Sequence, residues 1–242
     1  MKKTVQAPPQ NTDYPPSMHE YCVANLKDSS KLVCRTAANP HSAATPEQLR
    51  MRFVLATNNP GKIQEMREIL PNLGIEFLTR NDVGIDIEIE ETGTTFKENA
   101  LLKADKICSL SGLPAIADDS GLMVDALCGE PGVYTSSFGG NGLSASERCE
   151  YLLNKLKGVK QRSAKFVCTI VCVFPNGETV SAQGECLGRI ADAPAGSGGF
   201  GYDPIFIAEG YDKTMAELTS EEKNMLSHRG AALRNFSMLL KE

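Results

Sequence analysis

Two adjacent carboxylates, Asp118 and Asp119, follow the apolar residues Ala115–Ala117 and precede Ser120 and Gly121. Like charges side by side repel each other unless a cation or hydrogen-bond donors compensate. Carboxylate oxygens also suit Mg²⁺, which is usually held by one or two carboxylates together with substrate phosphates. These residues alone fit either a turn that ends a buried strand or a metal site.

A second acidic pair, Glu90 and Glu91, could supply a further metal ligand. A metal beside a phosphate-binding turn would neutralise charge in phosphoryl transfer. Taken alone, the pair is more typical of a solvated acidic face, because acidic residues already alternate there with Ile85, Ile87 and Ile89.

The segment TNNPGK, Thr57 to Lys62, separates a predicted strand from a predicted helix. A helix N-terminus offers unpaired N–H groups and a positive dipole end, which suit phosphate. Gly61 permits close backbone approach, and Lys62 adds a charge. The spaced glycine-lysine pattern of a P-loop is absent, and a plain strand-to-helix turn remains open, since Asn and Gly are common in turns.

Helical spacing places Asn99 and Lys103 on the apolar face that Phe96, Ala100 and Ile107 define. Lys103 therefore either extends its ammonium to solvent along that face or reaches into a cleft as a second phosphate cation.

The glycine-rich segment GSGGFGYDP, residues 196–204, contains Phe200 and Asp203. An aromatic side chain in such a loop can stack on a nucleobase, and Asp203 could accept a hydrogen bond from a ring N–H. The alternative is an ordinary loop before the strand-like segment PIFIA.

In the segment LTSEEKNMLSHRG, residues 218–230, Ser227 is a candidate cap for a helix that begins with His228 and Arg229. Cations are disfavoured at a helix N-terminus, and such a local conflict points mildly to function. Lys223 is the other basic group in this segment. A lone histidine is more often structural than catalytic, and no catalytic triad can be inferred from the spacing.

Alternating strand and helix signals predict an α/β fold with a central mixed sheet. Capping-box pairs predict helix starts at Thr95, Ser144 and Thr219, and Gly112 should end the first of these helices. Further predicted elements are a strand over 52–57, a helix over 61–70 that ends near Gly74, a strand over 114–118, a central strand over 164–174, a hairpin at 175–178 with its return strand, and a helix carrying Leu233, Phe236 and Leu240.

The chain has 242 residues, of which 41% are hydrophobic and 23% charged, with a net charge of −5. This composition is typical of a soluble globular protein, and nucleic-acid binding is not expected because no Lys/Arg stripe is present. No apolar run has the length of a membrane span, and no signal-peptide pattern follows the N-terminus. The eight cysteines lack CxxC spacing, which favours reduced, buried thiols in the cytoplasm.

Residues 1–50 differ from the rest, because they contain six prolines and no sustained apolar period. They are predicted to be a disordered N-terminal extension. The folded domain is expected to span residues 51–242.

The ordered blocks TNNPGK, EETGTTFKENALLKA, AIADDSGLMVDAL, PGVY, GGFGYDPIF and ELTSEEKNMLSHRGAAL together resemble the inosine triphosphate pyrophosphatase family, also described as dITP/XTP pyrophosphatases. The resemblance begins near Met51. It implies two lobes around an active-site cleft, usually in a homodimer. It also implies Mg²⁺-dependent hydrolysis of a non-standard purine nucleoside triphosphate to the monophosphate and pyrophosphate, with water attacking the α-phosphorus.

The resemblance also implies roles for residues. Glu90 and Asp119 would bind the metal, Asp119 would accept the proton of the attacking water, and Glu91 and Asp118 could bind the metal through water. The substrate contacts implied are Thr57, Asn58, Asn59, Pro60, Gly61, Lys62 and Lys103 for the triphosphate, Ser120, and Phe200, Gly201, Tyr202, Asp203, Lys223, His228 and Arg229 around the base and sugar.

One block departs from the family pattern, because Thr135, Ser136 and Ser137 stand where many relatives have Ser-Ala-Arg. Any contact of that arginine is missing here. Two alternatives stay open: a Maf-like pyrophosphatase for pyrimidine or modified nucleotides, and a nucleotide-binding sensor without catalysis. The SHR block and Phe200 favour a purine, and the retained carboxylates and lysines favour an enzyme.

Overall fold

The computed structural model describes residues 51–70 and 75–240. The predicted N-terminal extension, residues 1–50, and the predicted helix stop at Gly74 lie outside the described residues. In the described part, no helix is long and apolar enough to cross a membrane.

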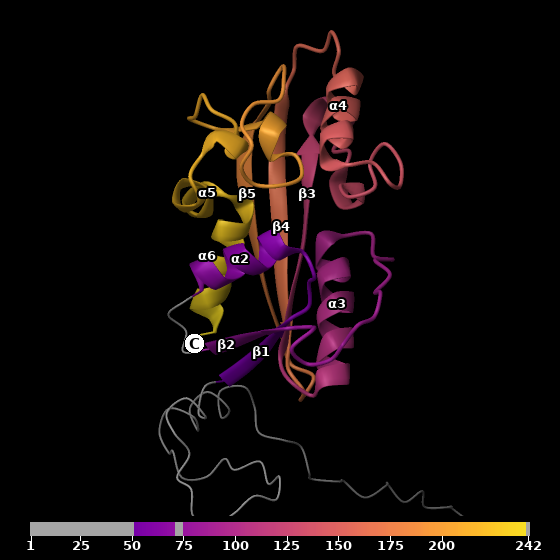
Figure 1. Cartoon of the computed structure of the whole chain (residues 1–242), viewed down its shortest axis with the longest axis vertical. Coiled ribbons are helices and arrows are strands. Elements are labelled where there is room, and N and C mark those ends of the chain that lie inside the picture. The colour runs from indigo at the N-terminus through magenta and orange to yellow at the C-terminus, as the bar shows by residue number, and fades with distance from the viewer. Residues whose placement is uncertain (1–50, 71–74, 241–242) are drawn as a thin grey trace, which may run out of the picture. The chain divides into compact units, whose positions relative to one another are not determined.

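Within the described residues, six strands form one mixed sheet in the order β2-β1-β3-β4-β5-β6. Figure 1 labels β1 to β5 of this sheet. The strands are β1 (Met51–Leu55), β2 (Ile75–Thr79), β3 (Ala115–Val124), β4 (Ser163–Val173), β5 (Thr179–Ile190) and β6 (Phe206–Ala208). Strands β2, β1 and β3 run parallel, and the pairs from β3 to β6 are antiparallel. The predicted α/β fold with a central mixed sheet is confirmed, and β4 is central as expected.

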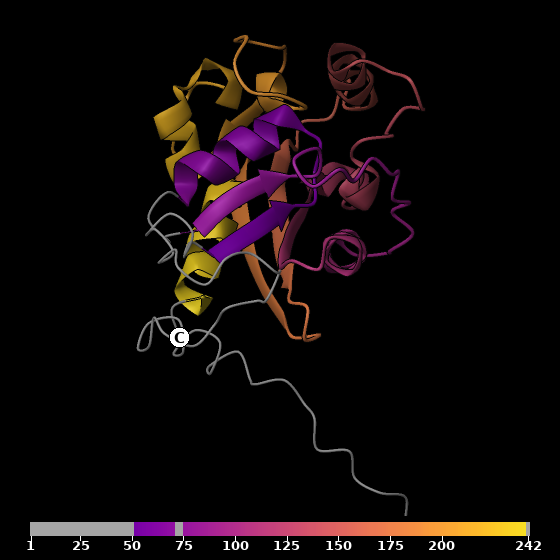
Figure 2. The same cartoon turned by 60° about the horizontal axis from the view of Figure 1, so that its bottom comes forward.

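The helices are α2 (Pro60–Ile69), α3 (Phe96–Ser111), α4 (Ala145–Lys155), α5 (Ser220–Leu226) and α6 (His228–Leu239). All three predicted capping boxes are present, and Gly112 ends α3 with a φ of 66°. Helix α3 packs on β3 and β4, whereas α6 packs on β4 and β5. The two helices lie on opposite sides of the sheet (Figure 2).

Among the described residues, two hydrophobic clusters form much of the core. One joins the C-terminal end of β3 and the N-terminal end of β4 to α4 and β6, and includes Leu122, Leu152 and Phe206. The other joins β1 and β3 to α3, and includes Val54 and Ile107. The two clusters draw on opposite ends of β3.

The structure differs from the sequence analysis, or adds to it, at three places. The alternating segment around Ile85, Ile87 and Ile89, which was assigned to no element, forms no strand, and its isoleucines pack on the α3 cluster. Strand β2 was not recognised, since only five residues carry it. Strand β3 does not end at Asp118 but continues to Val124, because its pairing with β4 runs through both aspartates.

Candidate active site

A cavity of about 760 Å³ opens where the ends of β1 and β2, the middle of β3 and the start of α6 meet. Fifteen of the site residues expected from the sequence line it: Thr57, Asn58, Asn59, Lys62, Glu91, Lys103, Asp119, Ser120, Phe200, Gly201, Tyr202, Asp203, Lys223, His228 and Arg229. Four do not line it, namely Pro60, Gly61, Glu90 and Asp118. The sequence-predicted segments therefore converge on one place, although they are far apart in the chain.

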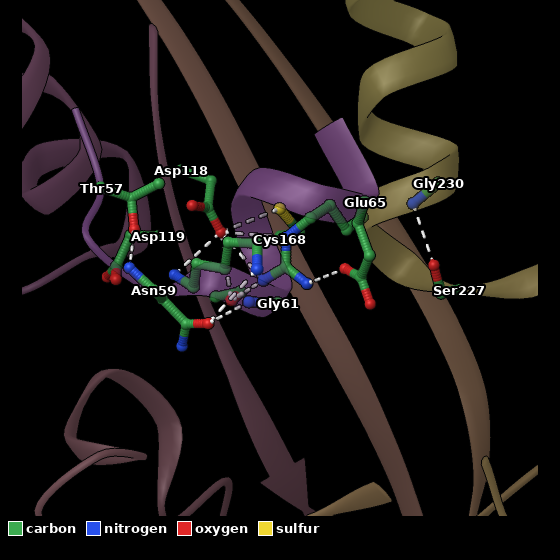
Figure 3. Close-up of polar contacts among 12 residues, drawn as sticks. Thr57, Asn59, Gly61, Glu65, Asp118, Asp119, Cys168, Ser227 and Gly230 are labelled. Carbon is green, nitrogen blue, oxygen red and sulfur yellow. Dashed lines mark hydrogen bonds and ion pairs between the residues drawn. The ribbon is translucent and has the colours of Figure 1, made fainter. Parts of the chain in front are cut away.

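Asp118 and Asp119 point to opposite faces of β3, as consecutive residues of a strand must. Asp118 is buried on the α6 side, where its Oδ2 lies 2.9 Å from Lys62 Nζ and 2.9 Å from Arg229 Nη2 (Figure 3). Burial alone would raise the pKa of this carboxyl, but Lys62 and Arg229 outweigh it and hold the pKa well below the usual value. Asp118 is therefore a permanent anion that positions two cations.

Asp119 faces α3 and the cavity. Its Oδ1 lies 3.2 Å from Lys103 Nζ, and its Oδ2 accepts a hydrogen bond from Asn99 Nδ2 at 3.3 Å. Burial raises the pKa of Asp119; Lys103 opposes this rise and the Glu91 charge adds to it. A carboxylate that holds a proton more tightly than an ordinary aspartate is suited to accept one from water.

Glu91, and not Glu90, is the second carboxylate at this point. Lys103 Nζ lies 2.6 Å from Glu91 Oε1, so one ammonium contacts both Glu91 and Asp119. Glu90 is exposed and does not line the cavity. The sequence could not separate the two, because residues 85–92 are irregular and their side-chain directions do not follow a simple period.

The two carboxylates fit a hard divalent cation in donor type and number. The described residues contain no group of three or more His, Cys, Asp or Glu side chains arranged for a metal. Mg²⁺ characteristically takes only one or two carboxylates from a protein and completes its shell with water and phosphate oxygens. Asp119 and Glu91 match that pattern, whereas Asp118 faces the α6 side, where its Oδ2 is paired with Lys62 and Arg229.

The segment after β1 is organised by its own side chains. Asn59 caps α2 by accepting hydrogen bonds from the backbone N–H groups of Gly61 (2.9 Å) and Lys62 (3.3 Å). Thr57 Oγ1 accepts from the Asn59 N–H at 3.2 Å. A phosphate that used the helix N-terminus would therefore have to share or displace the Asn59 cap.

Gly61 is required by packing rather than by an approaching ligand. A Cβ at this position would lie 2.7 Å from the ring of Phe200. The glycine thus allows the glycine-rich loop to sit directly on the start of α2.

Glu65 is a site residue that the sequence analysis missed. Its carboxylate is buried and accepts from Arg229 Nη1 at 2.6 Å (Figure 3). It also accepts from Lys223 Nζ at 2.8 Å, so it ties α2 to both α6 and α5. Lys62, Glu65, Met66 and Ile69 share one helical face by 3–4 spacing. An acidic residue on a buried helical stripe was the available signal.

The start of α6 resolves the conflict that the sequence raised. Ser227 caps the helix by accepting from Gly230 N at 3.0 Å, as expected. Arg229 is only 1% exposed and sits in the first turn, but Asp118 and Glu65 compensate its charge. The same two carboxylates fix the direction of its guanidinium, which also donates to Ser120 Oγ at 2.9 Å.

Aromatic rings flank the basic groups at this end of the cavity. His228 stacks on Phe166, with centroids 4.6 Å apart and planes 12° apart. Phe200 lies beneath Lys223, whose Nζ is 4.6 Å from the ring centroid. Burial, together with the charges of Arg229 and Lys223, lowers the pKa of His228 well below its usual value, so the imidazole is neutral. Phe166 was missed because a phenylalanine in a central strand is indistinguishable from core.

Asp203 lines the cavity as expected, and its carboxylate is paired within the protein. Its Oδ2 accepts from Phe200 N at 2.8 Å and from Lys223 Nζ at 2.7 Å. These bonds fix the glycine-rich loop. Tyr202 likewise donates its hydroxyl to the Thr135 carbonyl oxygen at 3.2 Å, so the loop is joined to the segment in which the family pattern departs.

A cation-and-carboxylate cavity at the carboxyl ends of parallel strands is characteristic of α/β proteins that bind phosphorylated ligands. The Ham1 family model matches residues 53–239, so the chain belongs to the Ham1 family. It is 47% identical to dITP/XTP pyrophosphatases from Treponema denticola, covering 79% of this chain and 99% of the relative, and from Bacillus subtilis, covering 77% and 96%.

Two solved structures have the same fold. A HAM1 protein from Coxiella burnetii is 42% identical with a TM-score of 0.73, covering 79% of this chain and 98% of its own. The Staphylococcus aureus Ham1 protein is also 42% identical, with a TM-score of 0.71 and coverage of 78% and 98%. The sequence resemblance and the fold class are therefore both confirmed.

Proposed function

We propose that the chain hydrolyses non-standard purine nucleoside triphosphates, namely ITP, dITP and XTP, to the monophosphate and pyrophosphate, and so removes them from the nucleotide pool. The observation that supports this is that Lys103 Nζ lies within 3.2 Å of both Asp119 and Glu91, in a cavity that is also lined by Phe200 and His228. Relatives that cover most of the chain are named dITP/XTP pyrophosphatases, which supports the same activity.

Each end of the cavity would have its own task. Lys62 and Lys103 would neutralise the triphosphate, and Asp119 would accept the proton of the water that attacks the α-phosphorus. Thr57, Asn58 and Asn59 would contact the phosphates from the α2 side, with Pro60 and Gly61 shaping that turn. Mg²⁺, held by Asp119 and Glu91, would supply charge neutralisation on the phosphate oxygens when bound.

Arg229 has few free N–H donors with which to recognise a base. Its Nε and Nη2 donate to Asp118 and Ser120, and its Nη1 donates to Glu65. A guanidinium has five N–H donors, so about one remains for a 6-oxo group. With a 6-amino base that donor, and any neighbouring backbone N–H, would stay unpaired, which can discriminate about 10⁴-fold.

Pyrophosphate release from ITP, XTP, GTP, ATP and UTP, each with and without Mg²⁺, tests the proposal. We expect ITP and XTP to have the highest kcat/KM, and no release without a divalent cation. Preference for UTP would favour the Maf-like alternative, and no release from any nucleotide would favour a binding sensor. The homodimer and the cytoplasmic location stay predictions, to be checked by light scattering and cell fractionation.

A further inference from the structure

Arg80 is a buried cation for which the described part of the chain supplies no anionic partner. Its residue is only 6% exposed, and it lines the same cavity as Lys62 and Lys103. Within the described residues it forms no ion pair, and its one side-chain hydrogen bond is from Nη2 to the carbonyl oxygen of Ile87. Its Nε is buried and has no partner in that part of the chain.

Such an arrangement is costly unless something else compensates it. A buried charge is normally paired with an opposite charge, because desolvation costs several kcal/mol per ion. The other buried arginine of the site, Arg229, obeys this rule through Glu65 and Asp118. Arg80 has only a neutral carbonyl, so an anion brought by a ligand is the missing partner.

The position of Arg80 in the sheet supports this reading. Leu55 pairs with Thr79 in the parallel β1–β2 ladder and with Ile116 in the β1–β3 ladder. Arg80 is therefore the first residue beyond β2, level with the residue that precedes Thr57, and one strand away from it. Ligands of α/β proteins lie beyond the carboxyl ends of parallel strands, and all three parallel strands then contribute to one site.

The backbone at Arg80 is also fixed. The Ile85 N–H donates to the Arg80 carbonyl oxygen at 2.9 Å, and Asp82 accepts from both the N–H and the hydroxyl of Thr79. The turn holds the arginine at the cavity whether or not the ligand is present.

We propose that Arg80 is a substrate-binding residue that contacts the outer phosphates of the triphosphate, beyond the group that Lys62 and Lys103 neutralise. The inference rests on the proposed function for its substrate. Its own claim is narrower: the cavity has a polyphosphate subsite, and Arg80 is part of it.

The test separates the phosphate end from the base end in the full-length chain. Calorimetry measures the Kd of inorganic tripolyphosphate and of inosine monophosphate for the wild type, Arg80→Gln and a matched control. The control is Arg52→Gln, which removes the same charge from an exposed position on β1 outside the cavity. We expect Arg80→Gln to weaken tripolyphosphate about 10-fold or more, as loss of a charge-assisted bond predicts, and inosine monophosphate hardly at all.

Other outcomes overturn the proposal. Equal weakening of both probes would show that Arg80 only supports the loop through Ile87, and an Arg80→Gln Kd equal to that of Arg52→Gln would show no phosphate contact. If Arg80→Gln does not fold, Arg80→Lys replaces it, with the same selective loss for tripolyphosphate expected and an unselective loss contradicting it. Absence of nucleotide hydrolysis in the wild type would refute the proposed function, while the tripolyphosphate result would still decide the role of Arg80.

Discussion

Asp118 is enclosed by cations, whereas its neighbour Asp119 shares a single lysine with another carboxylate. The alternation of side chains along β3 alone produces this difference. Burial raises the pKa of Asp119, but Lys62 and Arg229 overcome the same effect at Asp118. Removing the charge of Asp119 and removing that of Asp118 should therefore have different effects on turnover and stability.

Asp119→Asn should retain the fold and lose turnover. Because the folded pKa of Asp119 is raised, its ionised form is disfavoured by folding at neutral pH, and a neutral amide costs little. Loss of a general base lowers kcat about 100- to 10,000-fold. Asp118→Asn should instead lose about 3–5 kcal/mol of unfolding free energy, because it removes the anion that Lys62 contacts and one of the two anions that compensate the buried Arg229.

Urea unfolding and pyrophosphate release from ITP check both variants. Asp105→Asn, an exposed substitution on α3, is the matched control and should change neither quantity. Turnover of Asp119→Asn at the wild-type rate would contradict the proton-acceptor role. Wild-type stability of Asp118→Asn would contradict the ion-pair argument.

At the level of residues, the sequence predicted those side chains whose position follows from neighbouring residues in the chain. Lys103 was found because it interrupts an apolar helical stripe, and the Asp118–Asp119 difference follows from strand alternation. Glu65 could not be assigned a role because its partners, Lys223 and Arg229, lie far along the chain. Arg80 could not be assigned one because its burial at the cavity is visible only in the tertiary fold. The choice between Glu90 and Glu91 depends on an irregular segment, for which no periodic rule applies.

At the level of elements, helix starts were predictable because a capping box is made by four consecutive residues. Thr95, Ser144 and Thr219 all satisfy it. Strands depend instead on a partner elsewhere in the chain. The isoleucines of 85–89 have the alternation of a strand without a partner, and β2 has a partner but only a short pattern.

The close packing of α6 on β5 can be tested by a substitution at Gly184. Gly184 faces α6, and a Cβ there would collide with the backbone of His228 and Ala232. Gly184→Ala should push the helix off the sheet, costing about 1–3 kcal/mol as overpacking does, and should displace His228 and Arg229. We expect a raised KM for ITP together with a lower urea midpoint.

Gln183→Ala, at the exposed neighbouring position, is the control and should be close to wild type. Because tripolyphosphate does not use the base end, its Kd should be unchanged in Gly184→Ala. A Gly184→Ala variant with wild-type stability and KM would show that the helix can shift without moving the base-binding groups.

At the level of the whole molecule, the cavity depends on contacts between distant parts of the domain. Arg229 of α6 contacts Glu65 of α2 and Asp118 of β3, so three elements must be in place before either lobe presents its groups. The fold class followed from local patterns, but this assembly did not. Its three contacting elements, α2, β3 and α6, all lie between Pro60 and Leu239.

A chain that begins at Met51 is therefore expected to fold and to be fully active. The family model starts at residue 53, and the Treponema denticola relative aligns over 99% of its own length while covering 79% of this chain. A cut before Met51 leaves β1 and its pairing from Met51 to Ile75 whole. The kcat and KM for ITP, the urea midpoint and the mass in solution should all match those of the full chain, apart from the mass removed. Loss of activity or solubility in the shortened chain, with the full chain as control, would show that residues 1–50 contribute to the working domain.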